Sequence, residues 1–163
     1  ERKRMFALMA SMDIPMVMDD TRALLAYAEG QAAANTKIVG TVGYCMSGRY
    51  AVNAATHFAD RVKAAASIYG THLATDRDDS PHLAASKTQA ELYFACAETD
   101  IYAPTEIIEK VEQGMKGAKA EVEIYPGTHH GFAFPKRPVY DRDAAERHWE
   151  RLLALYRRNL VQP

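Results

Sequence analysis

The sequence predicts an α/β fold, a parallel sheet with flanking helices, and three observations support this. Four short runs have the apolar, β-branched or alternating composition of strands. Longer segments with helical spacing separate them, as in chains of strand–helix repeats. A tight turn of small residues joins the first strand directly to a helix. We expect strands at residues 37–42, 62–70, 91–97 and 120–125, and helices at residues 1–12, 14–30, 49–59, 105–117 and 141–159.

Length and composition place the chain among ordinary globular proteins. Its 163 residues suit a single domain, residues 1–163, and 48% hydrophobic with 25% charged residues is typical of a soluble one. Lysine and arginine number 20 against 21 acidic residues, so we expect neither nucleic acid nor a membrane surface as a partner. No apolar run is long enough to cross a membrane. Two cysteines are too few for a disulfide framework, which favours a cytoplasmic location.

Two helices are predicted ahead of the first strand. The second has the start and stop signals of a helix, with Asp13 as the N-cap, Pro15 in the first turn and Gly30 at the end. The first carries apolar side chains on one face. We interpret the methionines as core residues rather than as metal or redox ligands. The residues expected to pack from these helices are Met5, Leu8, Met9, Met12, Val17, Leu24, Leu25 and Tyr27.

The turn Gly43-Tyr44-Cys45-Met46-Ser47-Gly48 follows the first strand and precedes an alanine-rich helix. Small residues on both sides of Cys45 allow the strand and the helix to approach closely, as a sharp turn requires. Cys45 at the apex projects its sulfur beside amides at a helix N-terminus, and those amides favour a thiolate and can hold an oxyanion. A small buried cysteine in a tight turn is the alternative, and the turn alone does not exclude it.

The segments after this helix are expected to differ in exposure. Residues 71–87 are polar and contain a charge cluster, so we expect a long surface loop whose His72 and His82 are solvated rather than metal ligands. Cys96 lies inside the third strand and is expected to be inert. Thr105 is the expected cap of the following helix. The final helix is predicted to pack through Trp149, Leu152, Leu153 and either Leu155 or Tyr156.

Three polar residues come shortly after predicted strands: Cys45 after the first, Asp100 after the third and His130 after the fourth. In open α/β sheets the chemistry gathers at the carboxyl ends of the strands, so we expect these side chains to lie together. A thiol needs a base or a cation to become reactive, which imidazole supplies, and a carboxylate orients the ring. The order nucleophile, acid, histidine favours a catalytic triad. His129 is the alternative histidine.

From about residue 19 to residue 160, the chain resembles the dienelactone hydrolase family of α/β-hydrolases. The motifs that carry the resemblance are Gly43-Tyr44-Cys45-Met46-Ser47-Gly48-Arg49, Ser80-Pro81-His82, Ala97-Glu98-Thr99-Asp100, and Tyr125-Pro126-Gly127 through His130-Gly131-Phe132. The resemblance implies an α/β-hydrolase-type sheet and hydrolysis of lactones or small esters through a thioester, with no cofactor and no metal. It places the triad on Cys45, Asp100 and His130. It also implies an oxyanion donor in the backbone amide of Met46, and substrate contacts at Tyr69 and Phe134.

The chain departs from this family in three places. The family's domain is longer, and we expect its first strands to be absent from this chain, together with the second oxyanion donor and the acidic group that holds the resting thiol. Phe134 stands where dienelactone hydrolases proper carry an arginine that grips a substrate carboxylate, which argues against an anionic dienelactone as the substrate. Ser47 replaces the usual second glycine and is small enough to keep the turn.

Two other interpretations of function compete with hydrolysis. Glutamine amidotransferase-like domains also place cysteine at such a turn, but they pair it with a motif unlike His130-Gly131-Phe132. A catalytically degenerate module that serves assembly or ligand binding is favoured by the missing strands and opposed by the intact triad. The first strand would leave one edge unpaired, with only Lys37 to protect it. We therefore expect the chain to form homo-oligomers or to pair with an N-terminal segment.

Overall fold

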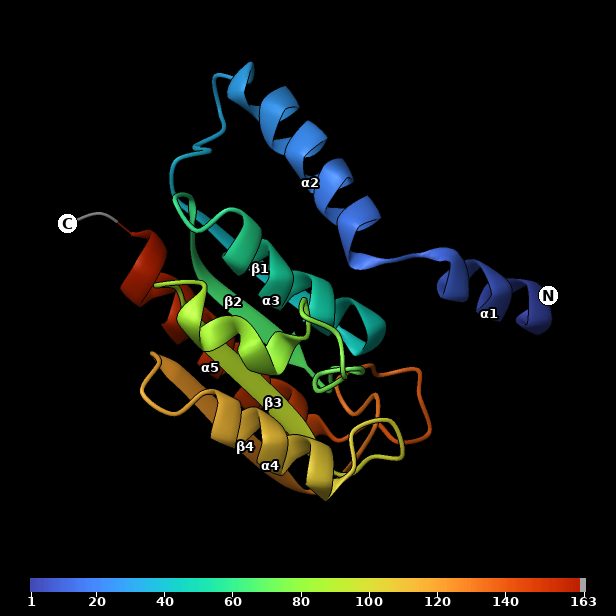
Figure 1. Ribbon diagram of the computed structural model, residues 1–163. Coiled ribbons are helices and arrows are strands. Elements are labelled where there is room, and N and C mark those ends of the chain that lie inside the picture. Colours follow the sequence, from blue (N-terminus) through green and yellow to red (C-terminus); the bar gives the residue numbers. More distant parts are fainter. Residues whose placement is uncertain (162–163) are drawn as a thin grey trace.

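The computed structural model describes residues 1–161, which form a four-stranded sheet in the order β1-β2-β3-β4 (Figure 1). All three strand pairs are parallel, which confirms the predicted sheet. Because all four strands run in the same direction, their carboxyl ends lie at one edge of the sheet. The strands are β1 Val39–Tyr44, β2 Val62–Ile68, β3 Glu91–Thr99 and β4 Ala120–His129.

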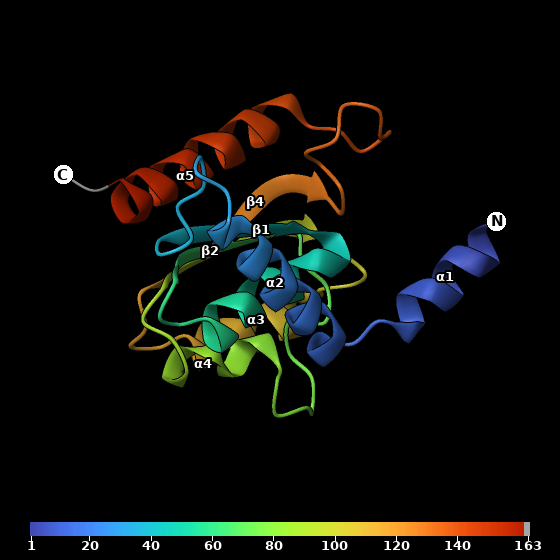
Figure 2. The same ribbon diagram turned by 90° about the horizontal axis from the view of Figure 1, so that it is seen from above.

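Helices cover both faces of this sheet. In Figure 2, α5 lies along one face, and α3 and α4 lie on the other, with α2 packed outside α3. No helix within residues 1–161 combines the length and the apolar character that crossing a bilayer requires. The helices are α1 Arg2–Ser11, α2 Ile14–Glu29, α3 Gly48–His57, α4 Thr105–Gly114 and α5 Arg142–Leu160, and two short 3-10 helices are η1 Cys45–Ser47 and η2 Pro81–Ser86.

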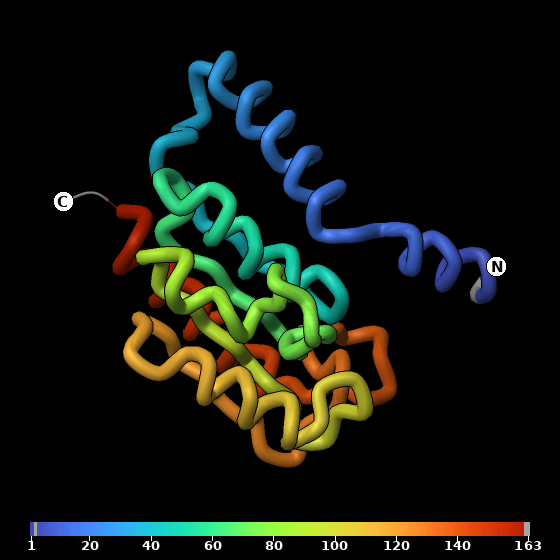
Figure 3. The backbone as a smooth tube through the Cα atoms, viewed as in Figure 1, coloured from blue at the N-terminus to red at the C-terminus, as the bar shows by residue number. Residues whose placement is uncertain are grey.

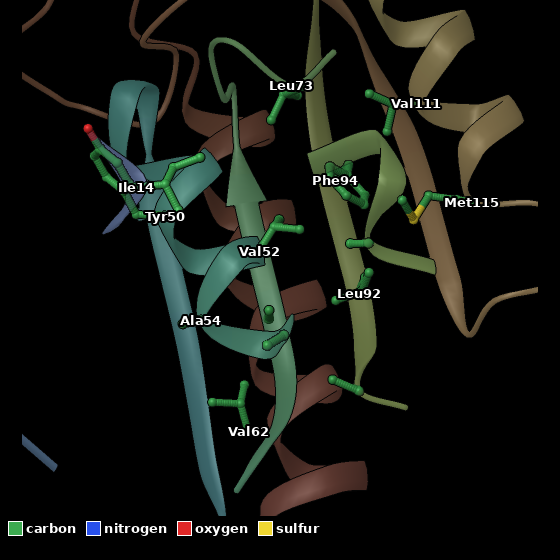
Figure 4. Close-up of a cluster of buried hydrophobic side chains, with 14 of the residues drawn as sticks. Ile14, Tyr50, Val52, Ala54, Val62, Leu73, Leu92, Phe94, Val111 and Met115 are labelled. Atoms are coloured by element: carbon green, nitrogen blue, oxygen red, sulfur yellow. The ribbon is translucent and has the colours of Figure 1, made fainter. Parts of the chain in front are cut away.

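Alternation along the strands builds two hydrophobic cores. On β3, Leu92, Phe94 and Cys96 face α3 and α4, whereas Tyr93 and Ala95 face α5. Figure 4 shows the first of these cores, in which Leu92 and Phe94 meet side chains from α3 and α4. Burying each large apolar side chain stabilises the fold by about 1.5–3 kcal/mol. Cys96 lies inside this core, and its predicted burial is confirmed.

The start signals of the helices were predicted with mixed success. Asp13 caps α2 by accepting the Met16 backbone N–H at 2.9 Å, and Gly30 is the C-cap, so both predictions are confirmed. The prediction for Thr105 is wrong, because the N-cap of α4 is Pro104 and no side chain caps this helix. Pro104 has extended backbone angles and a φ of −63°, which lead directly into the first helical residue.

The prediction that the N-terminal methionines belong to the core is wrong for most of them. Helix α1 projects away from the rest of the chain (Figure 3), and the apolar side chains of α1 and of the outer face of α2 are exposed. Met18 is buried against α3, and Met115 is buried elsewhere in the same core. The exposed large side chains are Met5, Phe6, Leu8, Met12, Met16, Leu24 and Tyr27.

Residues 71–87 form the predicted surface loop only in part, since residues 71–80 are irregular and Asp76, Arg77 and Asp78 are exposed. They contain η2, and the side chains of Leu73, Ser80 and Ala84 are buried against α3 and α4. Ser80 ties the segment together, because its hydroxyl accepts the Thr75 backbone N–H at 2.8 Å. Local polarity did not reveal these contacts, since the buried residues are scattered along the segment.

Helix α5 contacts the sheet through part of the face that the sequence predicted. Leu152 and Leu155 are buried there, and Tyr156 packs at the margin of the core. Trp149 and Leu153 are about half exposed, so the prediction that they pack is wrong for these two residues.

Candidate active site

A strained turn holds Cys45 at the end of β1. Cys45 has a φ of 55°, in the left-handed region that residues with a side chain rarely occupy. The turn has room for nothing larger than glycine at Gly43, where a Cβ atom would lie 2.0 Å from the Ser47 carbonyl oxygen. The same holds at Gly48, where it would lie 2.3 Å from the Ser67 hydroxyl oxygen. The small residues therefore allow the sharp reversal between β1 and α3.

Ser47 fixes the turn by hydrogen bonding to both backbone groups of Tyr44. Its hydroxyl donates to the Tyr44 carbonyl at 2.7 Å and accepts the Tyr44 N–H at 2.8 Å. The Ser47 hydroxyl thus provides a hydrogen-bond partner for both backbone polar groups of Tyr44, the last residue of β1. Where the family pattern has glycine, this chain uses serine as a clamp on the turn that presents Cys45.

Asp100 and His130 meet because β3 and β4 are longer than predicted. Strand β3 runs to Thr99 and β4 runs to His129, and these two residues are paired partners. Asp100 and His130 are therefore the next residues of two adjacent strands. His130 Nδ1 lies 2.7 Å from Asp100 Oδ2, and the two side chains are only 11% and 1% exposed, respectively. The other carboxylate oxygen of Asp100 accepts the backbone N–H of Tyr102 at 2.8 Å.

The environment of Cys45 favours its thiolate. The neighbouring His130 imidazole lowers the pKa of the Cys45 thiol below 9.0, against the effect of partial burial, and the Met46 backbone N–H acts in the same direction. Burial lowers the pKa of His130, but the hydrogen bond to Asp100 and the neighbouring Cys45 thiol outweigh it and raise the pKa to about 9. Opposite shifts in a thiol and an imidazole are those of an ion pair. The structure thus brings Cys45, Asp100 and His130 together, as their placement in the sequence predicts.

His129, the alternative histidine, is placed differently. Its side chain is exposed, whereas that of His130 is directed at Asp100. Strand β4 ends at His129, whereas His130 is the first residue of the turn that follows, where its side chain meets Asp100. The Phe132 N–H bonds to the His129 backbone carbonyl at 3.1 Å and turns the chain back over the site.

Aromatic rings line one side of Cys45, and they include both residues predicted to contact substrate. The Tyr69 ring centroid lies 5.2 Å from that of His130 and 6.3 Å from that of Phe134. Tyr69 is buried, and its hydroxyl has no hydrogen-bond partner among the described residues. Burial raises its pKa well above the usual value of 10.0. Phe134 is 46% exposed, so its ring forms the accessible end of this aromatic wall.

Two features near Cys45 were missed by sequence reasoning. The positive charge of Arg137 lies close enough to lower the pKa of both Cys45 and Tyr69. The position of Arg137, seven residues after His130, could have indicated a cation near Cys45. Loop spacing alone, however, does not say in which direction the side chain points. The other feature is a hydrogen bond between Tyr44 and His148 on α5, for which the sequence carries no local signal. Within residues 1–161, no three His, Cys, Asp or Glu side chains are grouped as metal ligands would be.

The parallel sheet, the strained turn at its edge and the polar groups at the strand ends are those of the α/β-hydrolase fold. A solved structure titled "Putative Dienelactone Hydrolase" from Klebsiella pneumoniae has this fold, with a TM-score of 0.80 and 23% identity over 91% of this chain and 63% of that one. The model of the dienelactone hydrolase family matches residues 1–160, and the chain belongs to this family.

Two relatives by sequence are longer than this chain. A Synechocystis protein named "Putative carboxymethylenebutenolidase" is 30% identical over 88% of this chain and 60% of its own length. A Bradyrhizobium protein named "Probable 2-oxo-3-(5-oxofuran-2-ylidene)propanoate lactonase" is 28% identical over 92% of this chain and 62% of its own length. The chain therefore spans about three fifths of the length of these two relatives.

Proposed function

We propose that the protein hydrolyses small esters or lactones by acyl transfer to Cys45. The observation that carries this proposal is geometric: Cys45 lies in a strained turn at the end of β1, and the buried Asp100–His130 pair, joined at 2.7 Å, lies at the ends of β3 and β4. The opposite pKa shifts, downward in Cys45 and upward in His130, agree with this arrangement. Membership of the dienelactone hydrolase family supports the reaction class. The names of the relatives support a lactone as one kind of substrate.

In the proposed reaction, the Cys45 thiolate attacks the carbonyl carbon of the substrate, and the carbonyl oxygen becomes an oxyanion that accepts the Met46 N–H. Protonated His130 donates its Nε2 proton to the leaving oxygen as the carbon–oxygen bond breaks, which leaves a thioester on Cys45. His130 then takes a proton from a water molecule while the oxygen of that water attacks the carbonyl carbon of the thioester. Release of the acid restores the thiolate and the protonated ring. Asp100 holds the ring in the required tautomer throughout.

Residues Tyr69 and Phe134 are proposed to contact the substrate. Phe134 is the exposed ring beside the buried Tyr69, so it offers an apolar surface rather than a charge at the mouth of the site. A small uncharged ester or lactone suits this surface. We accordingly propose a small molecule as the partner and a cytoplasmic site of action, with no cofactor in the reaction.

The test uses p-nitrophenyl acetate with three single variants. Cys45→Ala and His130→Ala are expected to lower the rate alike, by about 1,000-fold or more, because members of a triad act as a unit. His129→Ala is the matched control and should keep the wild-type rate. Equal activity in all three variants would refute the mechanism. A protein that lacks activity and whose Cys45 is no more reactive than Cys96 would favour the degenerate module that serves assembly or ligand binding.

The edge of the sheet supports a second proposal, that β1 pairs with a further strand. Among the described residues β1 is paired on one side only, with β2, and Val42 is 40% exposed on it. An unpaired strand edge recruits another strand. The partner is either a second copy of the chain or an N-terminal segment outside residues 1–163. Light scattering on residues 1–163 should detect self-association. A stable monomer would contradict pairing between copies.

A further inference from the structure

A buried histidine on α5 holds the residue that precedes Cys45. His148 is fully buried, and its Nε2 atom lies 3.1 Å from the hydroxyl oxygen of Tyr44. These residues are 104 positions apart in the chain. The hydrogen bond joins the last residue of β1 to the first half of α5, which lies across one face of the sheet (Figure 2).

The surroundings of His148 fix the direction of this hydrogen bond. Its Nδ1 atom is bonded to the Ala145 carbonyl oxygen, which can only accept, so Nδ1 carries the proton. Nε2 is then the acceptor, and the Tyr44 hydroxyl is the donor. Burial raises the pKa of Tyr44 and lowers that of His148, so both groups stay neutral near pH 7. The pair is therefore a stable neutral contact rather than a titrating one.

Tyr44 passes this restraint to the site in two ways. Its backbone N–H and carbonyl are both bonded to the Ser47 hydroxyl, so the main chain of Tyr44 is part of the clamp on the turn. Its ring packs on Tyr69 at 5.9 Å between centroids, and Tyr69 packs in turn on His130 at 5.2 Å. A shift of the Tyr44 side chain would move both the turn that carries Cys45 and the ring behind His130.

From this arrangement we propose that His148 is a positioning residue for Cys45, acting through the Tyr44 hydroxyl. The hydrogen bond holds Tyr44 in the position that places the Cys45 thiol next to His130. This inference rests on the proposed function, since it concerns the thiol that the proposed reaction uses. It adds a link from α5 to the turn, which neither the triad nor the oxyanion donor includes.

The test measures alkylation of Cys45 by iodoacetamide across pH, a readout that needs no substrate. Tyr44→Phe removes only the hydroxyl and should slow alkylation near neutral pH by about fivefold, the factor of one net hydrogen bond. The midpoint of the alkylation profile should move to higher pH, because the thiolate is held less well against His130. A merely structural contribution would lower stability without moving this midpoint.

Tyr93→Phe is the matched control. It also removes a buried tyrosine hydroxyl from the α5 side of the sheet, where Tyr93 donates to Glu123 at 2.6 Å and bonds to the Tyr125 hydroxyl at 2.7 Å. This variant should lose stability and keep the wild-type alkylation profile. An equal shift in Tyr44→Phe and Tyr93→Phe, or no shift in Tyr44→Phe, would overturn the inference.

Variants at position 148 complete the test. His148→Leu should reproduce the shift of Tyr44→Phe, and combining the two should add little, because both remove the same bond. His148→Gln retains an acceptor for the Tyr44 hydroxyl and should restore part of the wild-type rate. A rate in His148→Gln equal to that in His148→Leu would contradict the hydrogen bond as the cause. A wild-type Cys45 no more reactive than Cys96 would overturn the proposed function itself.

Discussion

The end of β1 and the middle of β3 each carry a cysteine, and these two regions give the same residue opposite properties. At the end of β1, His130 lowers the pKa of the partly exposed Cys45. In the middle of β3, burial raises the pKa of Cys96 to about 12. The comparison shows that position along a strand, rather than residue type, sets the direction in which the pKa of a thiol shifts. A strand end meets loops and helix amides, whereas a strand interior meets only apolar side chains.

The largest expected difference between the two regions is in the rate of alkylation. Cys45 should react with iodoacetamide at least about 1,000-fold faster than Cys96 near neutral pH, because the thiolate is the nucleophile and the Cys96 pKa is about 12. Limited labelling of the folded protein followed by peptide mapping measures this ratio. Labelling in denaturant is the control, and there the two rates should converge. Preferential labelling of Cys96 in the folded protein would reverse the comparison.

The pH dependence of stability tests whether His130 is the cation beside Cys45. A histidine whose pKa is raised from 6.5 to about 9 stabilises the fold fully below pH 6.5, and this contribution is lost as the pH rises through about 9. The stability difference between wild type and His130→Gln should therefore be largest in mild acid and shrink toward pH 9 and above. Urea unfolding at a series of pH values measures it.

The exposed neighbour provides the control for this pH effect. His129→Gln changes an imidazole of the same type outside the buried pair, so its stability difference from wild type should not fall in the alkaline range. A difference for His130→Gln that stays constant from mild acid to alkaline pH would mean that His130 is not held as a cation.

Truncation of Cys96 separates packing from chemistry. Cys96→Ala should lower the free energy of unfolding by about 1 kcal/mol, because it removes one buried sulfur from the core of Leu92 and Phe94. Hydrolysis by the folded variant should be unchanged. Cys45→Ala should have the opposite profile, with little effect on unfolding and loss of hydrolysis. A loss of activity in folded Cys96→Ala would break the distinction between the two regions.

The smallest expected effect concerns Arg137. Its charge is the least of the influences that lower the pKa of Cys45, so Arg137→Gln should raise the pH midpoint of Cys45 alkylation by less than His130→Gln does. Lys136→Gln, at the neighbouring exposed position, is the matched control and should leave the midpoint in place. A larger shift in Arg137→Gln than in His130→Gln would make the arginine the main cation of the site.

Local signals predicted the elements that depend on local physics. The strand compositions gave a parallel sheet, because buried parallel strands need apolar side chains on both faces. The glycine and serine residues around Cys45 predicted the sharp turn, because larger residues do not fit there. Asp13 gave the start of α2, because its side chain bonds within its own first turn. Each of these predictions needed only residues that are neighbours in the chain.

Contacts between distant segments decided those features of the site and the core for which sequence-based prediction was ambiguous or wrong. The sequence predicted that Asp100 and His130 approach, but only the register of β3 with β4 selected His130 over His129 for this contact. Burial within residues 71–87 depends on α3 and α4, so polarity along the segment misjudged it. The bond from His148 to Tyr44 has no local signature, because its partners meet only when α5 lies across the sheet. Sequence alone therefore determined the sheet, the turn and the candidate nucleophile, and tertiary packing decided which side chains surround it.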